Sequence, residues 1–426
     1  MQIGHPDDMT LAIRNATIFV FGAGLFIGCG GSGSSRSDGS SSGTGGSQGV
    51  PDAGQPAKVE LPRVKAIRIA ASGGSNCAVT ELGGIRCWGN NNLGQIGDGT
   101  MNNKRSTPVD VSGLGAIATD VLTGNTATFA LTTSGGVKVW GSNKDGLFGN
   151  GTTAPQAGLM GPQDVPGLSS GITAVANTYL HACAITEQGL LKCWGLNNFG
   201  QLGDGTMVQR YSPVDVTGLT DTVKAVSVGG FYTCVLTSVG GVQCWGDNQW
   251  GQLGNGTTTQ RSVPSDVTGL TSGVAAIASG DYHACALMVG SGVKCWGRND
   301  DAQLGTGVTS RQENAPVDVA GLPGDLTGIS ATGANTCVLT SSGGIKCWGW
   351  NGRGELGDGT TSVHTSPVDV NGLTSGVTQV ATGNETICAL TITGGVKCWG
   401  RNDDGEIGDG TTIDRLEPAD VIGFGP

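Results

Sequence analysis

The dipeptide Trp-Gly recurs along this chain at a nearly constant interval. Successive copies are 52, 54, 51, 51, 52 and 51 residues apart, at Trp88, Trp140, Trp194, Trp245, Trp296, Trp348 and Trp399. An internal period near 50 residues is typical of propellers, solenoids and arrays. Length alone would suggest about three domains. The repeat instead predicts that residues 59–426 form one closed domain.

Each repeat contains four short segments that look like β-strands. In the unit around Trp245 these are strand A (223–229), strand B (232–237), strand C (242–246) and strand D (213–216). They are enriched in β-branched residues and bounded by Gly, Asn, Asp and Pro. Four strands repeated seven times predict an all-β fold, a seven-bladed β-propeller of four-stranded blades. The last strand D, at 418–421, has no unit after it. We therefore expect the ring to be closed by this C-terminal strand pairing into the first blade, begun by residues 64–88.

Composition and charge exclude several other classes of protein. Glycine accounts for 78 of 426 residues and charged residues for 13%, which disfavours helical bundles, coiled coils and α-helical solenoids. The net charge is −11, with 23 basic residues spread along the chain. A nucleic-acid groove needs clustered Lys and Arg, so no nucleic-acid partner is expected.

The first 28 residues have the pattern of a signal peptide of the lipoprotein type. An apolar run of 13 residues, 16–28, follows Arg14; it is too short to span a bilayer but has the length of a signal-peptide core. The run leads into Cys29 and resembles a bacterial lipobox, except that Phe26 stands where such boxes usually carry Leu. Translation could begin at Met1 or at Met9. The alternative is an ordinary secretory signal followed by a chance cysteine.

Residues 29–58 are predicted to be a flexible tether. Between residues 30 and 49, 16 of 20 residues are Gly or Ser, a composition that cannot bury enough apolar surface to fold. An acylated Cys29 followed by this tether would hold the propeller close to a membrane. The expected location is the cell envelope outside the cytoplasm, anchored by lipid in the outer membrane or at the cell surface.

Twelve of the 13 cysteines form pairs ten residues apart, with one member on strand B and one on strand C. A B–C hairpin places such residues opposite each other, within reach of a disulfide. The second unit lacks both members and carries Phe129 and Val139, as expected if the two cysteines are bonded. A zinc site is not expected, because the spacing is wrong and no histidine recurs. The predicted bridges, which imply an oxidising compartment, are Cys77–Cys87, Cys183–Cys193, Cys234–Cys244, Cys285–Cys295, Cys337–Cys347 and Cys388–Cys398.

The repeat resembles that of the regulator of chromosome condensation family of propellers. The resemblance is carried by segments such as GDYHACALMVGSGVKCWGRNDDAQLGTG (280–307) and GNETICALTITGGVKCWGRNDDGEIGDG (383–410) and covers about 360 residues. It implies a seven-bladed propeller. The eukaryotic namesake is a nuclear guanine-nucleotide exchange factor that docks on nucleosomes and a small GTPase. Secreted bacterial members resemble this chain better, and some of them bind and inhibit another protein through an aromatic face.

One end of the propeller is the candidate binding face. The A–B turns and C–D loops lie at this end of the blades, and the B–C and D–A turns lie at the other. Aromatic residues and histidines gather in its loops on neighbouring blades, and Tyr and Trp are enriched in binding hot spots. Packing between blades is the alternative role. The candidate residues are Tyr179, His181, Phe199, Phe231, Tyr232, Trp250, Tyr282, His283 and Trp350.

The recurring Leu-Gly-Asp-Gly-Thr sequence raises the question of calcium. It contains Asp98, Asp204, Asp358 and Asp409, but the oxygen spacing does not match an EF-hand and the closing Glu is missing. Asp before Gly is an ordinary turn former, so no metal is expected. Basic residues follow downstream and either pair with these carboxylates or only solvate the loop: Arg105, Arg210, Arg261, Arg311 and Arg415.

No set of residues points to catalysis. The chain has four histidines, and it contains neither a nucleophile elbow nor a phosphate-binding loop. We therefore expect a monomeric module, without cofactor, that binds another protein. The alternatives are a regulator resembling a guanine-nucleotide exchange factor, and a lyase or hydrolase acting on cell-envelope glycans.

Overall fold

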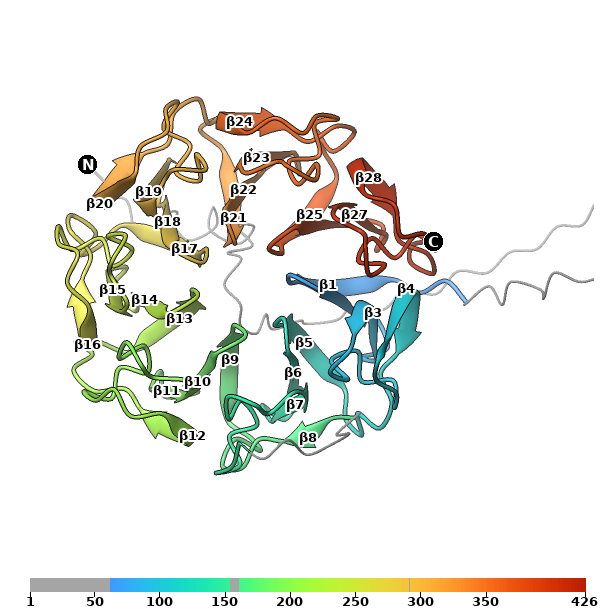
Figure 1. Cartoon of the computed structure of the whole chain (residues 1–426), viewed down its shortest axis with the longest axis horizontal. Coiled ribbons are helices and arrows are strands. Elements are labelled where there is room, and N and C mark those ends of the chain that lie inside the picture. Colours follow the sequence, from blue (N-terminus) through green and yellow to red (C-terminus); the bar gives the residue numbers. More distant parts are fainter. Residues whose placement is uncertain (1–61, 154–160, 291) are drawn as a thin grey trace, which may run out of the picture.

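Seven four-stranded antiparallel sheets form a closed ring (Figure 1). The computed structural model describes residues 62–153, 161–290 and 292–426. The predicted fold, a seven-bladed β-propeller, is confirmed. The predicted signal peptide, Cys29 and the whole of the predicted tether lie outside the described residues.

The strands of each blade run outward from the ring axis in the order A, B, C, D (Figure 1). The innermost A strands are β1 (Ala66–Ala71), β5 (Ala118–Thr123), β9 (Ile172–Asn177), β13 (Val223–Val228), β17 (Val274–Ser279), β21 (Leu326–Thr332) and β25 (Val377–Thr382). The B strands are β2 (Ser75–Thr80), β6 (Ala127–Thr132), β10 (His181–Thr186), β14 (Tyr232–Thr237), β18 (His283–Met288), β22 (Asn335–Thr340) and β26 (Thr386–Thr391).

The outer half of each blade consists of strands C and D. The C strands are β3 (Ile85–Asn91), β7 (Val137–Gly141), β11 (Leu191–Gly195), β15 (Val242–Gly246), β19 (Val293–Arg298), β23 (Ile345–Gly349) and β27 (Val396–Gly400). The D strands are β4 (Asn103–Asp110), β8 (Gln163–Asp164), β12 (Arg210–Asp215), β16 (Arg261–Asp266), β20 (Gln312–Asp318), β24 (His364–Asp369) and β28 (Arg415–Asp420).

The predicted closure of the ring by the C-terminal strand is wrong. β28 pairs with β27 inside the seventh blade, in a register that sets Lys397 opposite Asp420, and every blade is built from four consecutive strands. The ends of the ring meet instead through a short parallel bridge between Val64 and Phe424. Two backbone hydrogen bonds flank this bridge, from Val64 N to Gly423 O and from Gly425 N to Val64 O, each 3.1 Å long.

An ion pair between strands C and D recurs at the same register. In the seventh blade Lys397 Nζ lies 2.6 Å from Asp420 Oδ1. In six of the seven blades the basic residue of the C strand faces the Asp of the D strand that follows it, and in the fourth blade Gln243 donates to Asp266 instead. The pairing favours a D strand in the same blade as its preceding C strand. Equivalent pairs are Arg86–Asp110, Lys138–Asp164, Lys192–Asp215, Lys294–Asp318 and Lys346–Asp369.

The repeated tryptophans join neighbouring blades. All seven are fully buried, and each indole N–H donates a hydrogen bond of 2.7–2.9 Å to a backbone carbonyl in the C–D loop of the preceding blade. A buried indole needs such a partner. The Gly after each Trp is also required at its position: Gly246 has φ 111°, and a Cβ there would meet Phe231 O at 2.5 Å.

All six predicted disulfides are present. In each, the two cysteines are direct partners in the B–C hairpin, with Cα atoms 4.0–4.1 Å apart. In the second blade Phe129 and Val139 are partners at the equivalent register. Phe129 is buried there with its ring centroid 6.1 Å from that of Trp194, so an aromatic ring fills the space that a disulfide fills elsewhere.

Candidate functional site

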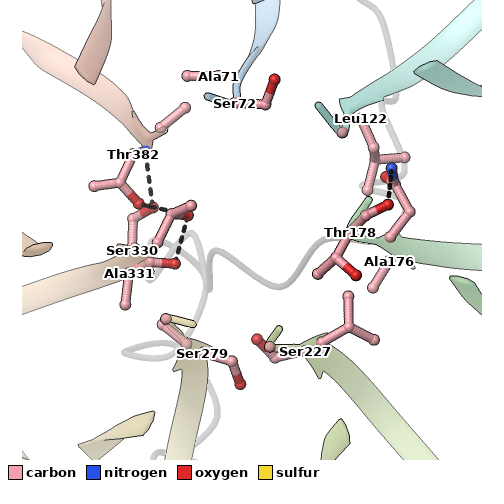
Figure 2. A pocket seen from close by; sticks show the side chains of 18 of the residues that line it. Ala71, Ser72, Leu122, Ala176, Thr178, Ser227, Ser279, Ser330, Ala331 and Thr382 are labelled. Atoms are coloured by element: carbon pink, nitrogen blue, oxygen red, sulfur yellow. Dashed lines mark hydrogen bonds between the residues drawn. The ribbon is translucent and has the colours of Figure 1, made fainter. Parts of the chain in front are cut away.

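A narrow channel runs along the ring axis and opens on the A–B/C–D end of the blades. Its cavity of about 120 Å³ is lined by the A strands, mostly through Ala, Ser and Thr side chains (Figure 2). Several hydroxyls bond across blade boundaries; Ser330 Oγ lies 2.8 Å from Thr382 Oγ1. The small side chains let seven strands approach the axis together.

A wider cavity of about 400 Å³ lies at the mouth of this channel. The loops of blades five, six and seven supply most of its functional groups. Its lining is polar and aromatic, and includes Asp281, Tyr282, Arg298, Trp350, Glu385 and Arg401. Trp350 is 42% exposed, so a large apolar surface stands open beside paired charges.

Four aromatic rings from three adjacent blades lie together on this face. Phe199 and Phe231 meet edge to face, with centroids 5.2 Å apart, and Phe231 stacks on Tyr282 at 6.5 Å. The Trp250 ring centroid also lies 6.5 Å from that of Tyr282. We call Phe199, Phe231, Trp250 and Tyr282 the aromatic cluster. All four side chains are half-buried, so the cluster is held by packing and still reaches solvent.

Two arginines from blade five hold the outer part of the cluster. The guanidinium carbons of Arg298 and Arg311 each lie 5.4 Å from the centre of the Trp250 ring, within the range of a cation–π interaction. Arg298 also pairs with Asp300 and Asp301. Among the described residues, the Arg311 guanidinium makes no ion pair or hydrogen bond, and its donors face solvent.

Three of the sequence-derived candidates do not lie on this surface. His181, Tyr232 and His283 are fully buried between blades, so as surface residues these predictions are wrong. Each is the first residue of a B strand, where the side chain points toward the next blade. His181 and His283 bond Thr233 and Thr336 of the next blade at 2.9 Å, and burial lowers the pKa of each imidazole to about 3. The Tyr232 hydroxyl donates to the carbonyl of His283.

The remaining candidates line the channel mouth. Tyr179 borders the channel together with Asp281. Burial, followed by the charge of Asp281, raises the pKa of the Tyr179 phenol to about 12. Burial also raises the pKa of Asp281, although the nearby Arg298 acts in the opposite direction. The channel mouth therefore combines two tyrosines, an indole and a largely buried carboxyl group.

The other half of the same face is charged. Arg401 Nη1 lies 2.6 Å from Glu385 Oε2, and its Nε lies 2.9 Å from Asp403 Oδ2. Arg353 bridges Asp403 and Asp414 at 3.4 and 2.9 Å. The face is thus divided into an aromatic half on blades three to five and an ion-pair network on blades six and seven.

The Leu-Gly-Asp-Gly-Thr loops are turns that use their own hydrogen bonds. Asp98 Oδ1 accepts bonds from Thr100 N at 3.0 Å and Oγ1 at 2.6 Å, while Oδ2 accepts a bond from Arg105 Nε at 2.7 Å. Asp204–Arg210 and Asp409–Arg415 repeat this pair, and His364 replaces the arginine beside Asp358.

The fifth blade lacks this Asp–Arg pair, and its arginine contributes to the aromatic site instead. Thr306 stands where four loops carry Asp and the loops of blades two and four carry Asn, so Arg311 has no carboxylate at that position and lies over Trp250 instead. Sequence reasoning missed Arg298 and Arg311 as site residues. The Arg retained without that Asp was the available signal, and Arg261 after Asn255 in the fourth blade shares it.

Comparison with known proteins agrees with the repeat and the ring. The sequence profile of the RCC1-like domain matches residues 17–375. The chain belongs to the RCC1-like family. A profile of the regulator of chromosome condensation (RCC1) repeat also matches residues 377–406.

Two RCC1-like relatives illustrate how the domain is used. The chain is 31% identical to the ultraviolet-B receptor UVR8 of Arabidopsis thaliana over 85% of this chain and 82% of the receptor. It is also 31% identical to the human E3 ubiquitin-protein ligase HERC2, over 78% of this chain but 7% of the ligase. The same domain therefore forms most of one protein and a small part of another.

Solved structures agree with the fold. Prp20p from Saccharomyces cerevisiae superposes with a TM-score of 0.71 at 21% identity, covering 84% of this chain and 87% of the yeast chain. Human WBSCR16 gives 0.67 at 23% identity, over 75% and 85%. The described residues contain no helix with the length and apolar character needed to cross a bilayer.

Proposed function

We propose that this RCC1-like propeller is a protein-binding module that engages its partner through the A–B/C–D face. The observation that carries the proposal is the aromatic cluster, flanked by Arg298 and Arg311. Half-buried aromatic rings and arginine are the residues enriched in interface hot spots, and their packing lowers the entropy cost of binding. The yeast protein with this fold is described as binding Gsp1p and histones, which supports a protein partner.

We further propose that the module works as a monomer outside the cytoplasm, tethered through an acylated Cys29. Six disulfides within the described residues support an oxidising compartment. The apolar run before Cys29 and the Gly/Ser-rich segment after it support a lipid anchor. The alternative, a regulator resembling an exchange factor, would need a nucleotide-binding partner in a reducing compartment, where these bridges would not persist.

Capture of a partner from an envelope extract tests the proposed face. The oxidised full chain serves as bait beside a Phe231→Ala/Trp250→Ala variant and a Val263→Ala/Leu416→Ala control on the outer D strands. A partner retained by wild type and the control but lost by the cluster variant supports the proposal. Tyr232 is unsuitable as a target because its side chain is buried between blades.

The comparison also has a clear negative outcome. If the cluster variant retains the partner as well as wild type does, the aromatic cluster is not the interface. If wild type captures no protein, the protein-binding role is wrong. Circular dichroism and the melting temperature of each variant show that the propeller is folded.

A further inference from the structure

The turns and loops at one end of the ring carry few charged side chains. We call the end formed by the B–C turns and D–A loops the hairpin face. Its turns (80–84, 132–136, 186–190, 237–241, 288–292, 340–344, 391–395) and loops (111–117, 165–171, 216–222, 267–273, 319–325, 370–376, 421–426) carry four charged side chains, Glu81, Glu187, Asp221 and Asp325. The ion-pair network lies on the opposite face. The charges at this end lie mainly at its outer rim, where the Asp residues that end the D strands are exposed beside the basic residues of the C strands; Asp318 and Asp420 are 81% and 83% exposed.

The same face presents the most exposed large aliphatic side chains of the described residues. Leu82, Ile392 and Val289 are 80%, 77% and 70% exposed, and each stands in a B–C turn. Val239 and Leu190 add two further turns. Single exposed apolar residues are ordinary. Because they recur on five of the seven B–C turns, exposed apolar side chains are distributed around one end of the ring.

Backbone hydrogen bonds join the apolar turns of the last, first and second blades. Ala66 N donates to Gly394 O in the turn that carries Ile392, and Glu81 N, in the turn that carries Leu82, donates to Lys65 O; both bonds are 2.9 Å. Ala118 N donates to Gly83 O at 2.9 Å, which places the exposed Ile117 beside Leu82. Three neighbouring blades thus bring Ile392, Leu82 and Ile117 to one side of the hairpin face.

The described chain begins on this side. Val64 N bonds Gly423 O at 3.1 Å, and Arg63 Nη1 bonds Pro426 O at 3.2 Å. The Gly/Ser-rich segment and Cys29 precede these residues in the sequence. A lipid on Cys29 would therefore tether the propeller from the side of the hairpin face. The aromatic cluster would then lie on the face directed away from the membrane.

We propose that the hairpin face rests on the lipid bilayer, with the aliphatic turn residues inserted among the headgroups. The proposal rests on the envelope location proposed above. Insertion of aliphatic side chains at the interface gains free energy with the apolar area buried. These turns and loops carry no Lys or Arg, and the exposed Asp residues at the rim would be repelled by an anionic surface. A zwitterionic phosphatidylcholine surface is the matching partner.

Vesicle sedimentation of the full chain tests this contact without the anchor. A Cys29→Ser chain is mixed with phosphatidylcholine vesicles, alone and with Leu82→Ser/Ile392→Ser. The control is Val308→Ser/Ile413→Ser on the opposite face, where the side chains are 62% and 64% exposed. We expect the turn variant to lower the partition coefficient about tenfold, because two inserted aliphatic side chains are lost, and the control to stay near wild type.

Three results would overturn the proposal. The first is that the Cys29→Ser chain does not sediment with the vesicles. The second is that the turn and control variants lower the partition coefficient equally, and the third is that binding requires phosphatidylglycerol. If the turn variant instead changes the molecular mass in solution without lipid, the hairpin face is a protein interface. Partner capture in detergent, and acylation of Cys29 measured by mass spectrometry, are separate readouts, so failure of the proposed function is distinguishable from failure of this contact.

Discussion

The indole N–H of Trp88 donates a 2.7 Å hydrogen bond to the backbone carbonyl of Glu406, across the junction where the first and last blades meet. Asn76 Nδ2 donates to the same carbonyl at 2.7 Å. The residue that closes the ring is therefore a buried glutamate. Most other blades carry Gln at this position, and the Gln252 amide donates to Asp247 Oδ2 at 2.9 Å. In Glu406, Oε2 accepts a bond from Asp404 N, while Oε1 is buried without a partner.

Glu406→Gln is expected to stabilise the ring at alkaline pH. Burial raises the pKa of Glu406 from 4.5 to about 7. The folded state therefore holds this proton more tightly than the unfolded state. The resulting stability is complete below pH 4.5 and is lost as pH rises through about 7. At pH 8 the variant should exceed wild type by about 2–3 kcal/mol in free energy of unfolding, measured by guanidinium denaturation.

The reverse change in another blade provides the control. Gln303→Glu should introduce the same loss of stability between pH 5 and pH 8, because Gln303 occupies the equivalent position and its carbonyl holds Trp348. Equal stability of wild type and Glu406→Gln at pH 8 would contradict this account.

His283→Asn is expected to make the free energy of unfolding depend less on pH between pH 7 and 5. The neutral imidazole is fully buried and its pKa is lowered to about 3 by burial, whereas an unfolded His titrates near 6.5. The unfolded state therefore binds more protons, and stability present above pH 6.5 is lost as pH falls toward 3. Between pH 7 and 5 wild type should lose about 2 kcal/mol that the variant retains. Asn is native at the equivalent position, 335; identical melting profiles from pH 7 to 5 would refute the prediction.

A seventh disulfide should form in Phe129→Cys/Val139→Cys. These residues are direct partners in the second hairpin, as the cysteines are in the other six. The bridge should contribute about 2–3 kcal/mol, but removal of a buried ring costs about 3–5 kcal/mol. We therefore expect full oxidation with slightly lower stability than wild type. Titration of free thiols in guanidinium measures the first effect, and two reactive thiols would show that the hairpin geometry does not allow the bridge.

Phe424→Ala should open the junction between the last and first blades. Phe424 is nearly buried, bridges Val64 and lies with its ring centroid 5.7 Å from that of Trp88. Its truncation should cost about 3 kcal/mol and speed amide hydrogen exchange in β1 and β27. The neighbouring Ile422→Ala should have a smaller effect, because Ile422 is 37% exposed whereas Phe424 is 6% exposed. Protection lost uniformly around the ring would argue against a local opening at this junction.

The repeat period and the paired cysteines were sufficient to predict the blades and the hairpin disulfides. Neither identifies the blade to which a D strand belongs, because a strand at the outer edge could pair on either side of a blade boundary. The recurring basic residue on strand C and Asp on strand D carried that information, as in Lys397 and Asp420.

The site was predictable only in part, because a shift of one residue along the chain decides whether a side chain is exposed or buried. Phe231 lies in a turn and reaches the surface, while Tyr232 begins a strand and points between blades. The position of Arg311 over Trp250 depends on contact between two blades, which no spacing within one repeat reveals.

Each disulfide links two strands of a single hairpin, and no described disulfide joins two blades. A repeat that is duplicated or deleted during evolution therefore carries its own cross-link with it. The neighbouring repeats keep their own complete cysteine pairs. The number of blades can therefore change without altering the disulfide pairing of the remaining blades.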